Sequence, residues 1–151
     1  MRENLQAAEQ ARRSGAARGA LLIVEDDLHS REGLRDLLAR SGFSVEIAAD
    51  GIQAIRKVKD AHFGGAIIDL DLPRFHGLTI DGWDVARICR AFVPDIALVL
   101  VSAEGGAHVG ARARGIPRCD FIEKPIDPER LKATLGRLAL GGEEERGDSR
   151  A

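Results

Sequence analysis

The sequence predicts an α/β fold: a doubly wound, five-stranded parallel sheet with helices on both faces. Short apolar runs alternate along the chain with segments in which apolar residues recur at helical spacing. Several runs have few polar interruptions, as strands covered on both faces require. Strands that alternate with helices are typical of a parallel sheet, because each crossover helix brings the chain back to the same end of the sheet.

Five segments have the composition of strands. The run at 20–25 suits a strand covered on both faces, whereas 44–49 alternates and suits a strand nearer an edge. The other three strands are expected at 65–69, 96–102 and 120–123.

Helical patterns fill the intervals between these strands. The apolar positions expected to share a face are, helix by helix, Leu28, Leu34, Leu37 and Leu38; Ile52, Ile55 and Val58; Val85, Ile88, Cys89 and Phe92; and Leu131, Leu135 and Leu138. The last helix should follow Asp127 as N-cap, with Pro128 at its first position. Residues 103–114 form the weakest helix, because its glycines each cost up to about 1 kcal/mol relative to alanine.

The organised domain is expected over residues 20–140. Residues 1–19 lack a convincing apolar face and are expected to form a flexible extension or a short helix. Residues 141–151 open with two glycines and are expected to form an acidic, flexible tail.

Composition argues against several classes of function. The formal net charge is -2, which gives no overall reason to expect binding to nucleic acid. No apolar stretch approaches the ~20 residues that span a bilayer, and the first residues lack the apolar core of a secretory signal. Cys89 and Cys119 form no CxxC pair and are expected to be small buried residues in a reducing compartment. We therefore expect a soluble, cytoplasmic protein.

Residues able to do chemistry stand at the ends of four strands. Glu25 and Asp26 come at the end of the first strand, Asp69 ends the third, Ser102 ends the fourth and Lys124 follows the fifth. In open parallel sheets, ligands bind beyond the carboxyl ends of the strands. Carboxylates about 4 Å apart repel each other by about 4 kcal/mol per pair at an effective dielectric constant near 20, so stability alone does not favour this arrangement.

A hard divalent cation would resolve the repulsion among these carboxylates. Mg²⁺ favours a few carboxylates together with waters and phosphate oxygens. Phosphoryl transfer needs positive charge around the phosphoryl oxygens, which Mg²⁺ and Lys124 would supply, with the Ser102 hydroxyl as a donor. The sequence therefore predicts a site that binds Mg²⁺ and holds or transfers a phosphoryl group.

Four motifs, LLIVEDD, IIDLDLP, VLVSA and FIEKPID, carry these residues. In order and approximate spacing they resemble the receiver domain of two-component response regulators, over essentially all of residues 20–140. The resemblance implies a flavodoxin-like strand order, 2-1-3-4-5. It also implies a phosphoprotein that takes its phosphoryl group from a sensor histidine kinase or a histidine phosphotransfer protein. Such a domain catalyses its own phosphotransfer and dephosphorylation and is not a dedicated enzyme.

Carried over by position, the resemblance gives roles to the residues of the first two motifs. Asp69 is implied to be the phosphoacceptor. Glu25, Asp26 and Asp69 are implied to bind Mg²⁺, together with the backbone carbonyl of Asp71. Asp27 is left as the expected cap of the first helix.

The resemblance also gives roles to the later motifs. Lys124 belongs to the catalytic site, and its bond to Pro125 is expected to be cis. Ser102 is expected to move toward the acyl phosphate, and Phe121 to fill the space that it vacates. The face made by residues 103–114, the fifth strand and the last helix would then repack and control a partner.

Two features of this sequence concern details of the family pattern: two acidic residues near the site, and a longer loop before the third helix. Asp71 and Glu104 each stand two residues after an active-site position and are expected to modulate the lifetime of the acyl phosphate. The loop at 74–82 is about five residues longer than the family pattern. Gly77 stands where the family's loop glycine belongs, yet a second Asp-Gly at 81–82 would equally well precede the third helix. The longer loop either alters access to the site or is a tolerated insertion.

Alternatives to a phosphorylated regulator remain open. Because eleven residues follow Leu140, we expect a stand-alone regulator or a phosphorelay intermediate. A binding module of the same architecture would work without phosphorylation. The motif DLDLP also resembles that of haloacid dehalogenase-type phosphatases, with Ser102 and Lys124 in the places of later motifs, although proline replaces their Thr or Val. A flavin-binding domain fits less well, because these carboxylates would repel a cofactor phosphate.

Overall fold

The structure, a computed structural model, describes residues 20–73 and 80–148. The expected N-terminal extension at 1–19 lies outside the described residues. So do residues 74–79, which make up most of the predicted long loop, and residues 149–151.

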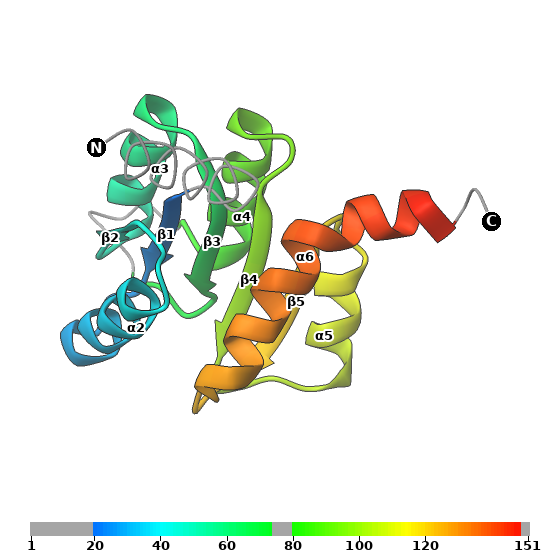
Figure 1. Ribbon diagram of the computed structural model, residues 1–151. Coiled ribbons are helices and arrows are strands. Elements are labelled where there is room, and N and C mark those ends of the chain that lie inside the picture. The colour runs from blue at the N-terminus through cyan, green and yellow to red at the C-terminus, as the bar shows by residue number, and fades with distance from the viewer. Residues whose placement is uncertain (1–19, 74–79, 149–151) are drawn as a thin grey trace, which may run out of the picture.

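Five parallel strands form one sheet in the order β2-β1-β3-β4-β5, which confirms the predicted fold class and strand order (Figure 1). The strands are β1 (Ala20–Val24), β2 (Val45–Ala48), β3 (Phe63–Asp69), β4 (Ala97–Ser102) and β5 (Cys119–Glu123). All of β4 is buried, and β3 is buried except at one position, because both of their faces are covered by helices.

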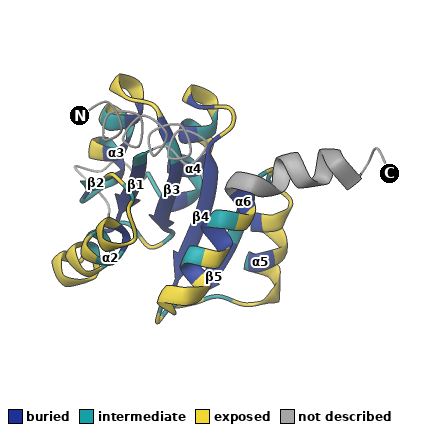
Figure 2. Cartoon of the chain, in the orientation of Figure 1, coloured by how far each residue is buried: buried dark blue, intermediate teal, exposed yellow. Residues whose placement is uncertain are grey.

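Helices cover both faces of the sheet and create two apolar cores. The helices are α2 (Leu28–Arg40), α3 (Gly51–Asp60), α4 (Gly82–Phe92), α5 (Ala107–Arg114) and α6 (Pro128–Asp148). Helices α3, α4 and α5 pack on one face around residues such as Val58, Val85 and Ala113. Helices α2 and α6 pack on the other face through Leu38, Leu131 and related side chains (Figures 1 and 2).

Acidic N-caps fix where four helices begin, including α3, where the Asp50 carboxylate accepts from the Gln53 N–H at 2.8 Å. The Asp27 carboxylate accepts a hydrogen bond from the Ser30 backbone N–H at 2.9 Å, as expected for the cap of α2. Asp81 caps α4 and forms a reciprocal capping box with Asp84. The helix therefore starts directly after Asp81, at Gly82. The Asp127 carboxylate accepts from the Glu129 N–H at 3.2 Å at the start of α6.

Two apolar residues assigned to buried helix faces are exposed instead. Leu28 and Phe92 are each 51% exposed. They are the first residue of α2 and the last residue of α4. Val93, one position beyond Phe92, is buried in the core.

The lengths of two helices also differ from expectation. Helix α5 begins at Ala107, four residues later than predicted, after Gly106, an N-cap that supplies no side-chain hydrogen bond. Helix α6 continues to Asp148, past the expected boundary at residue 140, because the glutamates that follow the two glycines are good helix formers. Among the described residues, no helix is both long and apolar enough to cross a membrane.

A close approach between α4 and the end of β3 depends on Gly82. A Cβ atom at this position would lie 2.4 Å from the Asp69 carbonyl oxygen and 2.6 Å from the Leu70 Cα. Both neighbours are backbone atoms that cannot swing aside. Glycine therefore lets the first turn of α4 rest directly on the strand that ends in Asp69.

We predict that Gly82→Ala lowers the free energy of unfolding by about 2 kcal/mol, because the new methyl group overlaps the β3 backbone. Urea denaturation followed by circular dichroism measures the change. Gly33→Ala is the matched control: a Cβ at Gly33, inside α2, meets nothing within 4 Å, so this variant should be more stable by up to about 1 kcal/mol. Equal effects of the two substitutions would contradict the close approach.

Candidate functional site

The register of the sheet brings the ends of β1, β3, β4 and β5 together. Val24 pairs with Ile68, which places the residues that follow them, Glu25 and Asp69, beside each other. Asp69 in turn pairs with Val101 of β4, next to Ser102. The backbone N–H of Lys124 donates to the Ser102 carbonyl at 2.9 Å and so extends the ladder to the end of β5.

Three carboxylates converge at this edge of the sheet. Oxygen atoms of Glu25, Asp26 and Asp69 all lie within 4.8 Å of one another. Glu25 and Asp69 are buried, at 3% and 2% exposure, whereas Asp26 is exposed. The cluster presents hard oxygen donors from two neighbouring strands, and one of the three faces solvent.

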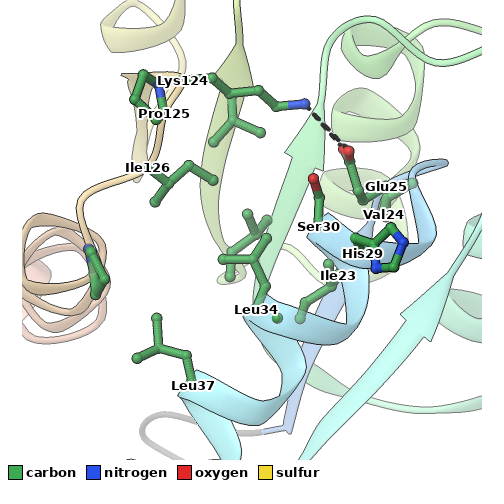
Figure 3. A pocket seen from close by; sticks show the side chains of 14 residues that line it. Ile23, Val24, Glu25, His29, Ser30, Leu34, Leu37, Lys124, Pro125 and Ile126 are labelled. Atoms are coloured by element: carbon green, nitrogen blue, oxygen red, sulfur yellow. Dashed lines mark hydrogen bonds and ion pairs between the residues drawn. The ribbon is translucent and has the colours of Figure 1, made fainter.

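Lys124 is the counter-charge of the two buried carboxylates. Its Nζ lies 2.9 Å from Asp69 Oδ2 and 3.3 Å from Glu25 Oε1. Figure 3 shows the lysine reaching from β5 across to Glu25 at the end of β1. The peptide bond between Lys124 and Pro125 is cis.

Burial and proximity divide the protons unequally among these groups. Burial raises the pKa of Glu25 to about 8, and the neighbouring Asp69 adds to the increase. Burial alone would also raise the pKa of Asp69, but hydrogen bonds from Glu25, the Asp71 N–H and Lys124 lower it below its usual value. Burial would lower the pKa of Lys124, yet its contacts with Asp69 and Glu25 raise it. Near neutral pH, Asp69 and Lys124 are charged and Glu25 largely holds a proton.

Ser102 and Asp71 interact through their side chains. The buried Ser102 Oγ donates to Asp71 Oδ2 at 2.7 Å and accepts from the Glu104 N–H at 3.1 Å. The Asp71 backbone N–H donates to Asp69 Oδ1 at 2.8 Å. From the sequence, Asp71 is expected to supply a backbone carbonyl ligand and to have a modulating role, but this contact of its carboxylate with Ser102 is not predicted, because 31 residues separate the two side chains.

Phe121 already occupies a buried position. The residue is 8% exposed, and a Cβ on Gly105 would come within 2.6 Å of two carbons of its ring. Glycine at this position therefore makes room for the aromatic ring. Glu104, the residue before this glycine, meets Ser102 through its backbone N–H and carbonyl.

Arg31 holds the acidic turn after β1 and was not singled out from the sequence. Its guanidinium donates to the carbonyl oxygen of Glu25 at 2.9 Å and to that of Asp26 at 3.3 Å. An arginine in the first turns of a helix is common on protein surfaces, so no sequence signal distinguished it. Its position fixes the backbone that carries two of the three clustered carboxylates.

A groove of about 390 Å³ adjoins the carboxylate cluster, between α2 and residues 124–128. Figure 3 shows Leu34, Leu37 and Ile126 along the groove, and the Lys124–Glu25 ion pair at one end. The sequence did not predict this groove, because its width depends on the spacing between α2 and α6.

We predict that the protein loses stability between about pH 4.5 and about pH 8, and that Glu25→Gln removes most of this loss. Folding raises the pKa of Glu25 from 4.5 to about 8, so the folded protein holds this proton more tightly than the unfolded chain does. The resulting stabilisation is complete below about pH 4.5 and is lost as the pH rises through about 8. Urea unfolding in the presence of a metal chelator measures the slope. Glu32→Gln, on the exposed side of α2, is the control and should keep the wild-type slope.

Comparisons with known proteins agree with this geometry. A family model described as the response regulator receiver domain matches residues 21–136. The response regulator MprA of Mycobacterium sp. (strain KMS) is 31% identical over 118 residues, which cover 78% of this chain and 49% of that protein. The chain thus spans about half the length of the curated relatives that it matches.

Solved structures share the fold. A CheY-like receiver domain protein from Methanospirillum hungatei JF-1 superposes with a TM-score of 0.72 at 22% identity, covering 83% of this chain and 97% of that one. A response regulator receiver protein from Sinorhizobium medicae WSM419 superposes with a TM-score of 0.70 at 26% identity, covering 80% and 93%. By the family match over residues 21–136, and with this fold, the chain belongs to the receiver domain family of response regulators.

Proposed function

We propose that this domain accepts a phosphoryl group on Asp69 from a histidine kinase or a histidine phosphotransfer protein. The observation that carries the proposal is the position of Asp69: its buried carboxylate lies 2.9 Å from the Lys124 ammonium, inside a cluster of three carboxylates. If Asp69 served only to cap the end of β3, the neighbouring carboxylates and Lys124 would not be needed.

Mg²⁺ is the cofactor that the site fits. The convergence of the Glu25, Asp26 and Asp69 oxygens within 4.8 Å supplies the hard donors that this ion prefers. The backbone carbonyl of Asp71 is proposed as a further ligand. When bound, Mg²⁺ would supply positive charge that offsets the carboxylates and the incoming phosphoryl oxygens. The exposure of Asp26 gives the ion a route from solvent.

The protein's own groups account for the transfer step. Ionised Asp69 attacks phosphorus, so that an oxygen–phosphorus bond forms as the bond from phosphorus to the donor's histidine nitrogen breaks. Lys124 and the Ser102 hydroxyl then contact the phosphoryl oxygens, because both lie at the same edge of the sheet. Asp71 and Glu104, on either side of Ser102, are proposed to modulate loss of the phosphoryl group.

The proposed output face consists of α5, β5 and α6. Asp120 of β5 forms ion pairs with Arg114 of α5 and Arg137 of α6, so one side chain ties the three elements together. Phe121 follows Asp120 on the same strand and packs beneath the segment that leads from Ser102 into α5. A change at Ser102 would therefore reach this face over a few residues. The partner that reads the face is proposed to be a protein.

We predict that acetyl phosphate and Mg²⁺ add one phosphoryl group to the protein and that Asp69→Asn abolishes the addition. Intact-mass spectrometry measures it, and release by hydroxylamine identifies an acyl phosphate. Asp36→Asn, which removes an exposed carboxylate on α2, is the control and should leave labelling unchanged. Labelling that survives Asp69→Asn would contradict the proposal. Sustained hydrolysis of small phosphate esters would instead favour a haloacid dehalogenase-type phosphatase.

We predict that Asp26→Asn weakens Mg²⁺ binding by at least about tenfold, because one of three clustered carboxylates is lost. Trp83, the one tryptophan of the chain, reports binding by fluorescence. It stands next to Gly82, which rests on the Asp69 backbone, and its ring lies 3.9 Å from the Arg112 guanidinium. Because Asp26 is exposed, its replacement should leave stability unchanged. Unaltered Mg²⁺ affinity in this variant would remove the carboxylate cluster as the metal site.

A further inference from the structure

The contact between Ser102 and Asp71 joins the proposed switch residue to a charged group outside the carboxylate cluster. The Ser102 hydroxyl lies 2.7 Å from Asp71 Oδ2, at a length typical of a charge-assisted hydrogen bond. Ser102 is 2% exposed, whereas Asp71 is an exposed residue. The bond therefore reaches from a buried hydroxyl to a carboxylate at the rim of the site.

A serine hydroxyl has a single proton to donate, and the carboxylate oxygen of Asp71, at 2.7 Å, is its shortest and only charged acceptor among the described residues. Two contacts with the Glu104 backbone remain: Ser102 Oγ accepts from the Glu104 N–H at 3.1 Å, and it lies 3.1 Å from the Glu104 carbonyl oxygen, a longer and uncharged alternative acceptor for the same proton. A phosphoryl group on Asp69 would also require the hydroxyl proton. It can have this proton only if the bond to Asp71 breaks.

Asp71 contacts both Asp69 and Ser102, the first through its backbone and the second through its side chain. Its N–H donates to Asp69 Oδ1 at 2.8 Å, so the carboxylate that holds Ser102 belongs to a residue already bonded to the proposed phosphoacceptor. A phosphoryl group arriving on Asp69 would add negative charge beside the Asp71 carboxylate. The same event would thus remove the donor from Asp71 and repel the carboxylate toward solvent.

We propose that the Asp71 carboxylate competes with the phosphoryl group for the Ser102 hydroxyl and thereby holds the domain in its unphosphorylated state. This inference rests on the proposed function of Asp69. Asp71 is a positioning residue, because it acts through Ser102. Its bond to Ser102 sets the binding free energy that a phosphoryl group must supply before Ser102 moves toward it. A ligand shifts such an equilibrium only by its differential affinity for the two states.

Repulsion between charges is a simpler explanation for any effect of Asp71 on phosphoryl binding, and the experiments must distinguish it from competition. A carboxylate near an anion site weakens anion binding whether or not it touches Ser102. The two explanations differ in what they require. Competition needs the Ser102 hydroxyl and an acceptor at position 71, whereas repulsion needs only the charge.

The first experiment measures the affinity for beryllofluoride, a phosphoryl mimic, with Mg²⁺ present and Trp83 fluorescence as the signal. Asp71→Ala should tighten binding by about fivefold or more, the usual scale of coupling between two states. Asp71→Asn, which keeps a weaker, neutral acceptor, should give an intermediate affinity. In a Ser102→Ala background both substitutions should lose most of their effect.

Three results would overturn the competition. The first is equal affinity of the Asn and Ala variants, and the second is an undiminished effect in the Ser102→Ala background; both indicate repulsion alone. The third is weaker binding on removal of the Asp71 carboxylate. Glu123→Gln is the matched charge control, because Glu123 is exposed at the end of β5 and pairs in register with Ser102. It should change affinity equally in both backgrounds.

A second experiment tests the bond without any phosphoryl mimic. Free energies of unfolding of the single and double variants at positions 71 and 102, measured with a chelator, form a double-mutant cycle. The losses should not be additive, because either single variant already breaks the bond. Additive losses of unfolding free energy would overturn the proposed competition, even if acetyl phosphate labels Asp69. Failure of acetyl phosphate to label Asp69 would instead count against the proposed function, so the two failures are separable.

Discussion

The ion pair of Lys124 with Asp69, together with the Lys124 contact to Glu25, is the interaction on which the site depends. A parallel sheet in the order β2-β1-β3-β4-β5 necessarily brings the carboxyl ends of β1 and β3 together, and here both carry acids. In this buried setting two ionised carboxylates would repel strongly. The lysine from β5 offsets one charge, and the raised pKa of Glu25 removes another by protonation. The protein thereby tolerates an arrangement that serves chemistry more than stability.

Much of this arrangement could be predicted from the sequence, because each apolar run stops at a polar residue and parallel strands stop at one edge. That reasoning brought Glu25, Asp26, Asp69, Ser102 and Lys124 to one place, as the structure has them. Side-chain direction could not be predicted in the same way. The Asp71 carboxylate depends on a rotamer, and the groove depends on the spacing between two helices.

Helix ends show a related limit of pattern reasoning. Spacing assigns a residue to a face, but it does not say whether the sheet extends beneath that residue. Leu28 and Phe92 fit the periodicity and are nevertheless exposed, because they lie at the ends of their helices. Capping residues predict ends more reliably, since Asp27, Asp81 and Asp127 act locally through backbone N–H groups.

Because α6 is long, a small rotation at its start would produce a large displacement at its end. The helix starts at Pro128, four residues after Lys124, and is 21 residues long; its first turns pack on the sheet and its C-terminal end extends away from it (Figure 1). At about 1.5 Å per residue it is about 30 Å long, so a tilt of about 10° at its base would displace its far end by about 5 Å. A sub-ångström adjustment next to the lysine could thus be amplified into a displacement large enough for a neighbouring molecule to sense.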